Sequence, residues 1–249
     1  MSFYGFNPTW ILLMVVSVAL GGITQSYINS AFRRWSQVPL DSGLTGAQVA
    51  ARVLEANGID VGTVGVNEVS GDAQRPHVRI QAVGGNLSDN YDPRDKTLNL
   101  SEAVYSASTV AAAGVAAHEA GHAVQDAQGY FWGRLRSALV PVATFGSRAA
   151  WILIVVGLLF GAASGLGANV ILLGIVFYAF AVLFQLVTLP VELDASHRAL
   201  VALEGTSTLD ASQLGGARQV LTAAALTYVA AALIALLQLL YLLGFLRRD

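Results

Sequence analysis

The sequence predicts a mainly α-helical integral membrane protein, with about four transmembrane helices and one small α+β domain outside the bilayer. Of its 249 residues, 55% are hydrophobic and only 12% are charged, whereas soluble domains carry about 25% charged residues. The charged residues are also unevenly spread, because three long segments contain none. Much of the chain must therefore face lipid, so the lipid bilayer is an expected partner.

Net charge and cysteine content narrow the range of functions. The net charge is only −2 at pH 7, so the composition predicts no nucleic-acid partner. The chain contains no cysteine, which removes both disulfides and thiolate metal ligands. Any metal site must therefore be built from histidines and carboxylates.

The uncharged segments predict the membrane spans. The first lies within 1–30, where 9–28 are long enough to cross about 30 Å of hydrocarbon as a helix. No basic region precedes it, so we expect a retained anchor rather than a signal peptide. A transmembrane hairpin is predicted at 149–190, interrupted by the turn-rich stretch 161–169. The last segment, 219–249, either crosses the membrane or re-enters it.

Residues 31–148 are predicted to form the water-soluble α+β part. Thr45 is a helix N-cap signal and Asn57-Gly58 a stop signal, which predicts a helix over 43–59. Further elements follow from alternating and turn-forming residues: strands at 63–69 and 77–83 paired as a hairpin across the loop "SGDAQRP", a turn at 88–95, a strand at 96–101, and a helix over 103–127.

That last helix contains "VAAHEAGHAVQDA", which brings two of the four histidines within four residues of each other. Residues four apart share a helix face, so His118 and His122 can both direct a ring nitrogen at one Zn²⁺. Glu119 then lies beside the metal, where its carboxylate can take a proton from zinc-bound water and later deliver it to the leaving amine. The alternative is two packed histidines and a solvated glutamate, but buried unpaired imidazoles are costly. Small neighbours such as Gly121 would let another backbone approach closely.

A catalytic zinc needs a third protein ligand, and we place it in the helical segment 191–218, within "LPVELDASHRAL". Pro190 is expected to begin a new helix there. Glu192 and Asp194 are two residues apart and face different ways, so only one can reach the metal. Asp194 can pair with Arg198 at i+4, whereas the residue at i+4 from Glu192 is the neutral Ser196. Glu192 is therefore the predicted ligand, with Asp194 and His197 as reserves.

Supporting roles are predicted less narrowly. Asp126 is four residues from His122 on the same face and could accept the second ring N–H of that ligand, although helix-surface solvation is an equal reading. A second donor to the tetrahedral oxyanion could be His197, Arg198 or Tyr105. The residues alone do not choose among these three.

Three segments together resemble a known family. The quoted stretches "GLTGAQVAARVLEANGI", "GNLSDNYDPRDKTLNLSEAVYSASTVAAAGVAAHEAGHAVQDA" and "LPVELDASHRAL" are similar to the YugP-type neutral zinc metallopeptidases of bacterial membranes, and more distantly to HtpX and the CAAX-prenyl endopeptidases. The resemblance implies a zincin-like domain with His118, His122 and Glu192 as zinc ligands and Glu119 as general base. Two departures stand out: "SGDAQRP" looks longer than the family loop, and Ser196 stands where HtpX-like proteins have Asp.

The expected function is that of a membrane-embedded zinc-dependent endopeptidase with one Zn²⁺ per chain. It would cut peptide or membrane-protein substrates near the bilayer surface, with the "TLNLS" strand receiving an extended peptide at its edge. The alternative is a non-catalytic membrane scaffold that keeps a structural zinc and binds peptides. An open coordination position and an unpaired Glu119 favour the enzyme, because structural zinc sites are normally closed by a fourth ligand.

Arginines predict the orientation of this multi-pass protein in the cell membrane. Arg33 and Arg34 follow the first span and no charge precedes it, so the positive-inside rule places the soluble domain in the cytoplasm. Arg247 and Arg248 disagree if the number of spans is four. The conflict disappears if the last hydrophobic segment is re-entrant.

Overall fold

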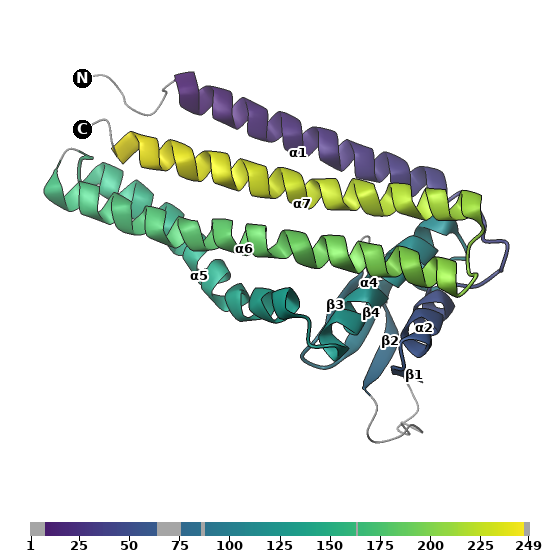
Figure 1. Ribbon diagram of the computed structural model, residues 1–249. Helices are drawn as coiled ribbons and strands as arrows, with labels where there is room; N and C mark the ends of the chain where they lie inside the picture. The colour runs from purple at the N-terminus through teal and green to yellow at the C-terminus, as the bar shows by residue number, and fades with distance from the viewer. Residues whose placement is uncertain (1–7, 64–75, 86–87, 163, 247–249) are drawn as a thin grey trace. The chain divides into compact units, whose positions relative to one another are not determined.

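The computed structural model describes residues 8–63, 76–85, 88–162 and 164–246, and confirms a mainly α-helical protein with a small mixed sheet (Figure 1). Its elements in chain order are α1 (Pro8–Trp35), α2 (Gly46–Ala56), β1 (Asp60–Thr63), β2 (His77–Val83), β3 (Asn90–Asp92), β4 (Thr97–Ser101), α3 (Glu102–Tyr105), α4 (Val110–Ala127), α5 (Phe131–Leu159), α6 (Gly165–Gly205) and α7 (Ala211–Leu246). The chain divides into two compact units. The helical unit comprises Met1–Gln25, Leu135–Pro190 and Thr227–Asp249, and the sheet unit comprises Ser26–Arg134 and Val191–Leu226.

Four helices, α1, α5, α6 and α7, are long and apolar enough to cross a membrane, with mean hydropathies of 1.8 to 2.7. They coincide with the four predicted spans but extend beyond them. Helix α5 begins at Phe131 rather than at 149, and α6 continues through Pro190 to Gly205. The expectation that Pro190 begins a new helix is therefore wrong. A proline removes one N–H donor from a helix. The remaining backbone hydrogen bonds of this 41-residue helix keep it continuous at that position.

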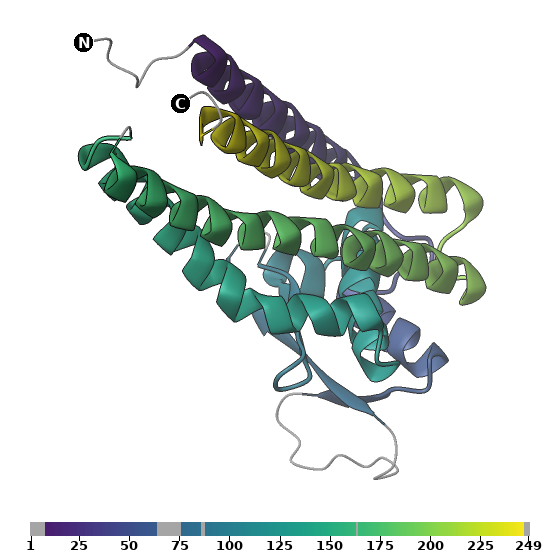
Figure 2. The same ribbon diagram turned by 60° about the vertical axis from the view of Figure 1, so that its left-hand side comes forward.

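Within the helical unit, α5 lies alongside the first part of α6 (Figure 2). Glycines permit this approach: a Cβ added at Gly157 would lie 2.6 Å from Ile171 Cγ1, and one added at Gly174 would lie 2.9 Å from the carbonyl oxygen of Ala150. Tyr178 donates a hydrogen bond of 2.5 Å to Gln238 Oε1 of α7. Close packing and such polar contacts are what hold helices together in lipid.

The sheet unit contains a four-stranded sheet of order β1-β2-β4-β3. Strands β1 and β2 pair in parallel, as do β2 and β4, whereas β3 and β4 are antiparallel. Of the predicted hairpin, the structure describes 77–83, which is confirmed as strand β2, and Thr63, which ends β1 and pairs in parallel with Ile80. Most of the predicted strand 63–69, and "SGDAQRP" up to Arg75, lie outside the described residues. Thr63 and His77 leave 13 residues between the strands (64 to 76), enough for the crossover that a parallel pair needs.

The edge of the sheet also differs from expectation. The strand predicted at 96–101 is confirmed as β4, but β4 lies between β2 and β3 and has no free edge for a peptide. The segment 88–95, expected to be a turn, contains the short edge strand β3. Asn90 and Asp92 have low strand propensity, and the pairing of this segment with β4 is a tertiary contact that overrides it.

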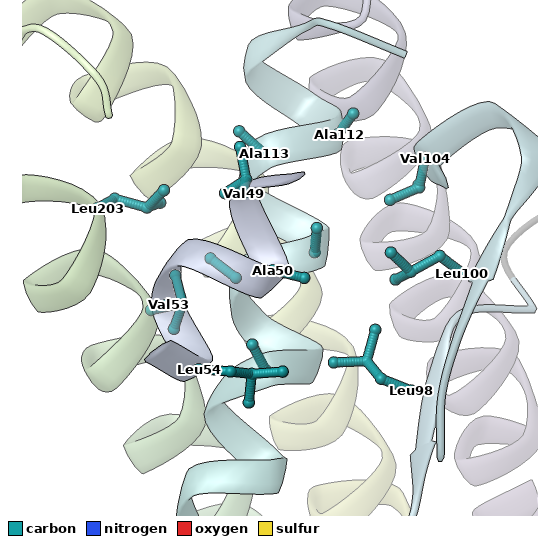
Figure 3. Packing of buried hydrophobic residues seen from close by; sticks show 14 of the residues in the cluster. Val49, Ala50, Val53, Leu54, Leu98, Leu100, Val104, Ala112, Ala113 and Leu203 are labelled. Carbon is teal, nitrogen blue, oxygen red and sulfur yellow. The ribbon is translucent and has the colours of Figure 1, made fainter. Parts of the chain in front are cut away.

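Helices α2 and α4 pack against each other and against the sheet. The predicted N-cap at Thr45 is confirmed and is completed by Gln48 as a capping box. Figure 3 shows the packing that results, in which apolar side chains of α2 meet those of β4, α4 and α6: Val49, Val53, Leu54, Leu98, Leu100, Ala112, Ala113 and Leu203. Each fully buried valine or leucine contributes about 1.5–3 kcal/mol of apolar burial, which anchors α4, the helix of the histidines, in a rigid core.

Candidate metal centre

Helix α4 sets the spacing of the two histidines. The helix expected over 103–127 is broken between α3 and α4, and Thr109 caps the new N-terminus by accepting a hydrogen bond from the Ala112 amide. Alanines fill the buried face of α4. His118 and His122 lie one turn apart and half-buried, with ring centroids 4.7 Å apart and ring planes at 82°. Their ring nitrogens are therefore presented to the same space.

The continuation of α6 past Pro190 brings Glu192 to these histidines. Glu192 Oε2 lies 3.2 Å from His118 Nε2 and 3.5 Å from His122 Nε2, and the glutamate is buried. Burial acts to lower the pKa of His122, but the hydrogen bond to Glu192 and the charges of Glu119 and Glu192 outweigh it and raise that pKa. The structure thus brings together the three side chains predicted as ligands.

This donor set fits zinc. One ligand atom from each of His118, His122 and Glu192 lies within 4.8 Å of the others. Zinc binds imidazole and carboxylate at about 2.0–2.2 Å with tetrahedral geometry, which separates neighbouring ligand atoms by about 3.4 Å. The observed nitrogen-to-oxygen distances of 3.2 and 3.5 Å bracket that value. Among the described residues, neither Asp194 nor His197 belongs to this group.

A glycine permits α6 to approach α4 at the metal centre. A Cβ added at Gly121 would lie 2.8 Å from the carbonyl oxygen of Ala195, and 3.4 Å from its Cα. The atoms that oppose it are backbone atoms, which cannot rotate away. The close approach expected from the small residues of the motif is confirmed at Gly121, and it carries Glu192 to the histidines.

We expect Gly121→Ala to lower the free energy of unfolding by about 1–3 kcal/mol, because the added methyl group overpacks the helix contact. It should also weaken zinc binding, since α6 must move away from α4. Thermal unfolding in detergent with and without zinc measures both effects. Gly133→Ala is a matched control, because its Cβ would meet only Tyr130 Cδ1 at 3.8 Å. Equal behaviour of the two variants would contradict the explanation.

Glu119 points toward the edge strand. Its Oε2 accepts a hydrogen bond of 3.1 Å from the backbone N–H of Tyr91 in β3. The sequence predicted an unpaired Glu119, and that prediction is wrong. The donor is a main-chain N–H of β3, in a segment that was predicted to be a turn. It stands outside the His118, His122 and Glu192 group. The hydrogen bond engages one carboxylate oxygen, which fixes the direction of the side chain.

The second ring nitrogens of both histidines have partners. His122 Nδ1 lies 3.0 Å from Gln125 Oε1, and His118 Nδ1 lies 3.2 Å from Ser196 Oγ. Outer partners of this kind orient ligand histidines. Ser196 therefore supplies a polar partner at the position where HtpX-like proteins have Asp.

Asp126 does not have the role considered for it. It accepts hydrogen bonds of 2.6 Å from Tyr91 Oη and from Lys96 Nζ, while Gln125 takes the place beside His122. Burial and Asp126 raise the pKa of Tyr91, so the phenol remains a donor. Asp126 thus links α4 to β3 through Tyr91. The residue that contacts His122 is Gln125, one position earlier in the helix.

Gln125 and Tyr91 are the two site residues that sequence reasoning missed. Gln125 is buried, and its Nε2 donates to Val191 O at 2.8 Å and to Asp194 Oδ2 at 2.7 Å. Its position three residues after His122, on the same side of the helix, was an available signal. Nothing in the sequence pointed to the Tyr91 amide. The predicted ion pair of Asp194 with Arg198 is confirmed.

The remaining candidates have other surroundings. Arg198 contacts Asp194, donates to Gln128 Oε1 at 2.6 Å, and lies over the ring of Tyr130. His197 is exposed and lines an open cavity of about 440 Å³ between α2, α4 and α6. Tyr105 packs against the hydrophobic core. None of these contacts identifies a second oxyanion donor.

Comparison with known proteins agrees with this centre. The family described as "Putative neutral zinc metallopeptidase" matches residues 10–247. A curated relative, "Putative membrane protease YugP" of Bacillus subtilis (strain 168), is 38% identical over 231 residues, which cover 93% of each chain. No solved structure matches the chain. The relative and the four apolar helices together assign the chain to a membrane.

Proposed function

Because the chain belongs to this neutral zinc metallopeptidase family, we propose that it is a membrane-embedded endopeptidase of the HExxH type. His118, His122 and Glu192 would hold one zinc ion per chain. One observation carries the proposal: two α4 histidines meet the buried carboxylate of Glu192, with Glu119 on the same helix and outside the ligand set. Three protein ligands leave a coordination position open, as hydrolytic zinc sites require.

Glu119 is the proposed general base. The Tyr91 amide holds its Oε2, which leaves Oε1 to accept a proton from the attacking water and to return it to the leaving amine. When bound, zinc would polarise the scissile carbonyl and lower the pKa of that water. Gln125 and Ser196 lie within hydrogen-bond distance of the second ring nitrogens of the two histidines, and the α6 backbone at Ala195 lies against α4 at Gly121.

The substrate class follows from the edge strand. Strand β3, which contacts α4 and ends the sheet, replaces β4 as the proposed place where an extended peptide adds by main-chain hydrogen bonding. Asn90 of this strand is exposed, which leaves that part of the edge accessible. Peptides and membrane proteins with an extended segment near the bilayer are therefore the proposed substrates.

The scaffold alternative has one observation in its favour. Glu119 makes a structural hydrogen bond to β3, which a non-catalytic peptide-binding protein with structural zinc would also use. Detergent-solubilised protein, an unbiased peptide library and a chelator separate the two. The enzyme predicts cleavage that stops on zinc removal and returns when zinc is restored. Absence of turnover in zinc-loaded protein, with peptide binding retained, would support the scaffold.

We propose that the sheet unit lies in the cytoplasm. Arg33 and Arg34 stand in the last turn of α1, and no charged residue precedes them, as the positive-inside rule requires. The native chain lacks cysteine, so Glu55→Cys on the exposed face of α2 provides a single label. It should resist an impermeant thiol reagent in intact cells and react after permeabilisation. Reaction in intact cells would overturn this orientation.

A further inference from the structure

We propose that Gln125 is a positioning residue that fixes which nitrogen of His122 faces the metal and, at the same time, holds the α6 turn that carries Glu192. The proposal rests on the proposed function for the identity of the metal. Gln125 is 2% exposed, which is unusual for an amide side chain. Both the nitrogen and the oxygen of its side-chain amide have hydrogen-bond partners.

The orientation of the Gln125 amide is determined by its surroundings. One of its terminal atoms lies 2.8 Å from the carbonyl oxygen of Val191 and 2.7 Å from Asp194 Oδ2. Both neighbours are acceptors, so the atom facing them must be the amide nitrogen, which is a donor. The oxygen, Oε1, is therefore the end that meets His122.

The orientation of the amide then determines the proton on His122. Gln125 Oε1 can only accept, and it lies 3.0 Å from His122 Nδ1. A hydrogen bond there requires that Nδ1 carry the proton. His122 Nε2, which lies on the side of Glu192, is left as the nitrogen that binds the metal. The hydroxyl of Ser196, by contrast, can donate or accept, so it imposes no such choice on His118.

Gln125 also braces the third ligand. Val191 and Asp194 flank Glu192 in α6, and the same amide nitrogen binds both. Arg198 holds Asp194 from the other side and is itself bound to Gln128. One buried side chain therefore links the second and the third ligand, and it sets their separation before the metal binds.

Gln125→Met should retain the volume of the side chain but lose all three hydrogen bonds. We expect zinc affinity, measured by chelator competition, to fall about 10- to 100-fold, the usual range for an outer partner of a ligand histidine. In the zinc-loaded protein, the protected Nδ1–H proton of His122 should disappear from the downfield NMR spectrum. Gln125→Asn, whose amide is one methylene shorter, tests the same idea if the methionine variant folds poorly.

Gln37→Met is the matched control, because it makes the same exchange at an exposed position outside this hydrogen-bond chain. It should bind zinc as wild type does and keep the Nδ1–H signal. Wild-type zinc affinity with an intact signal in Gln125→Met, or an equal loss in Gln37→Met, would overturn this inference alone. Failure of the wild-type protein to bind zinc would overturn the proposed function and this inference together.

Discussion

Glu119→Gln should slow peptide hydrolysis by orders of magnitude and leave zinc in place. Glutamine cannot accept a proton at neutral pH, so the attacking water loses its base and the leaving amine loses its acid. General acid–base catalysis contributes about 10²- to 10⁴-fold to a rate, and we expect a fall in kcat of that size. The fold should survive, because the oxygen of the new amide can still accept the hydrogen bond of the Tyr91 amide.

The measurement is turnover of a peptide substrate beside zinc content and thermal unfolding of the same preparation. Glu55→Gln is the matched control, since Glu55 is exposed on α2, and it should retain wild-type turnover. His118→Ala should instead lose zinc and activity together. A Glu119→Gln variant as active as wild type, or one that has lost its zinc, would refute the role of Glu119 as base.

Much of this centre could be predicted because its signals are local. The four-residue spacing of His118 and His122 predicts two ligands on one face of a single helix. The uncharged segments predict the membrane spans from composition alone. The competition between Glu192 and Asp194 could also be argued locally, because Arg198 stands at i+4 from Asp194. A ligand set drawn from two distant segments thus emerged from two separate local arguments.

The errors concern contacts between segments far apart in the chain. Parallel pairing of β1 with β2 depends on a crossover rather than on either strand. Strand β3 forms only because β4 offers it a partner, and its Tyr91 amide then reaches Glu119, 28 residues later. The prediction at Pro190 was wrong for a different reason: proline is a local helix-start signal, but α6 continues through this position.

Glu192→Gln should have the second large effect, on zinc binding rather than on a chemical step. It removes the charged member of the proposed set of three ligands, so affinity should fall by more than the roughly 10- to 100-fold that loss of an outer partner costs. Because α4 and α6 meet through this ligand, zinc should also stop stabilising the protein. A ligand that binds only the folded state raises the free energy of unfolding, and this increment should vanish in Glu192→Gln.

Asp194→Asn is the informative comparison, because it removes the same charge two residues away. Asp194 accepts hydrogen bonds from Gln125 and Arg198, and the oxygen of asparagine can still accept one of them. We therefore expect zinc affinity to fall within the range of an outer partner, and the rise in unfolding temperature on adding zinc to persist. Zinc titration and thermal unfolding of both variants, in the same detergent, decide between the two carboxylates. Equal loss in both, or retention of zinc in Glu192→Gln, would mean that the buried carboxylate beside the histidines is not the third ligand.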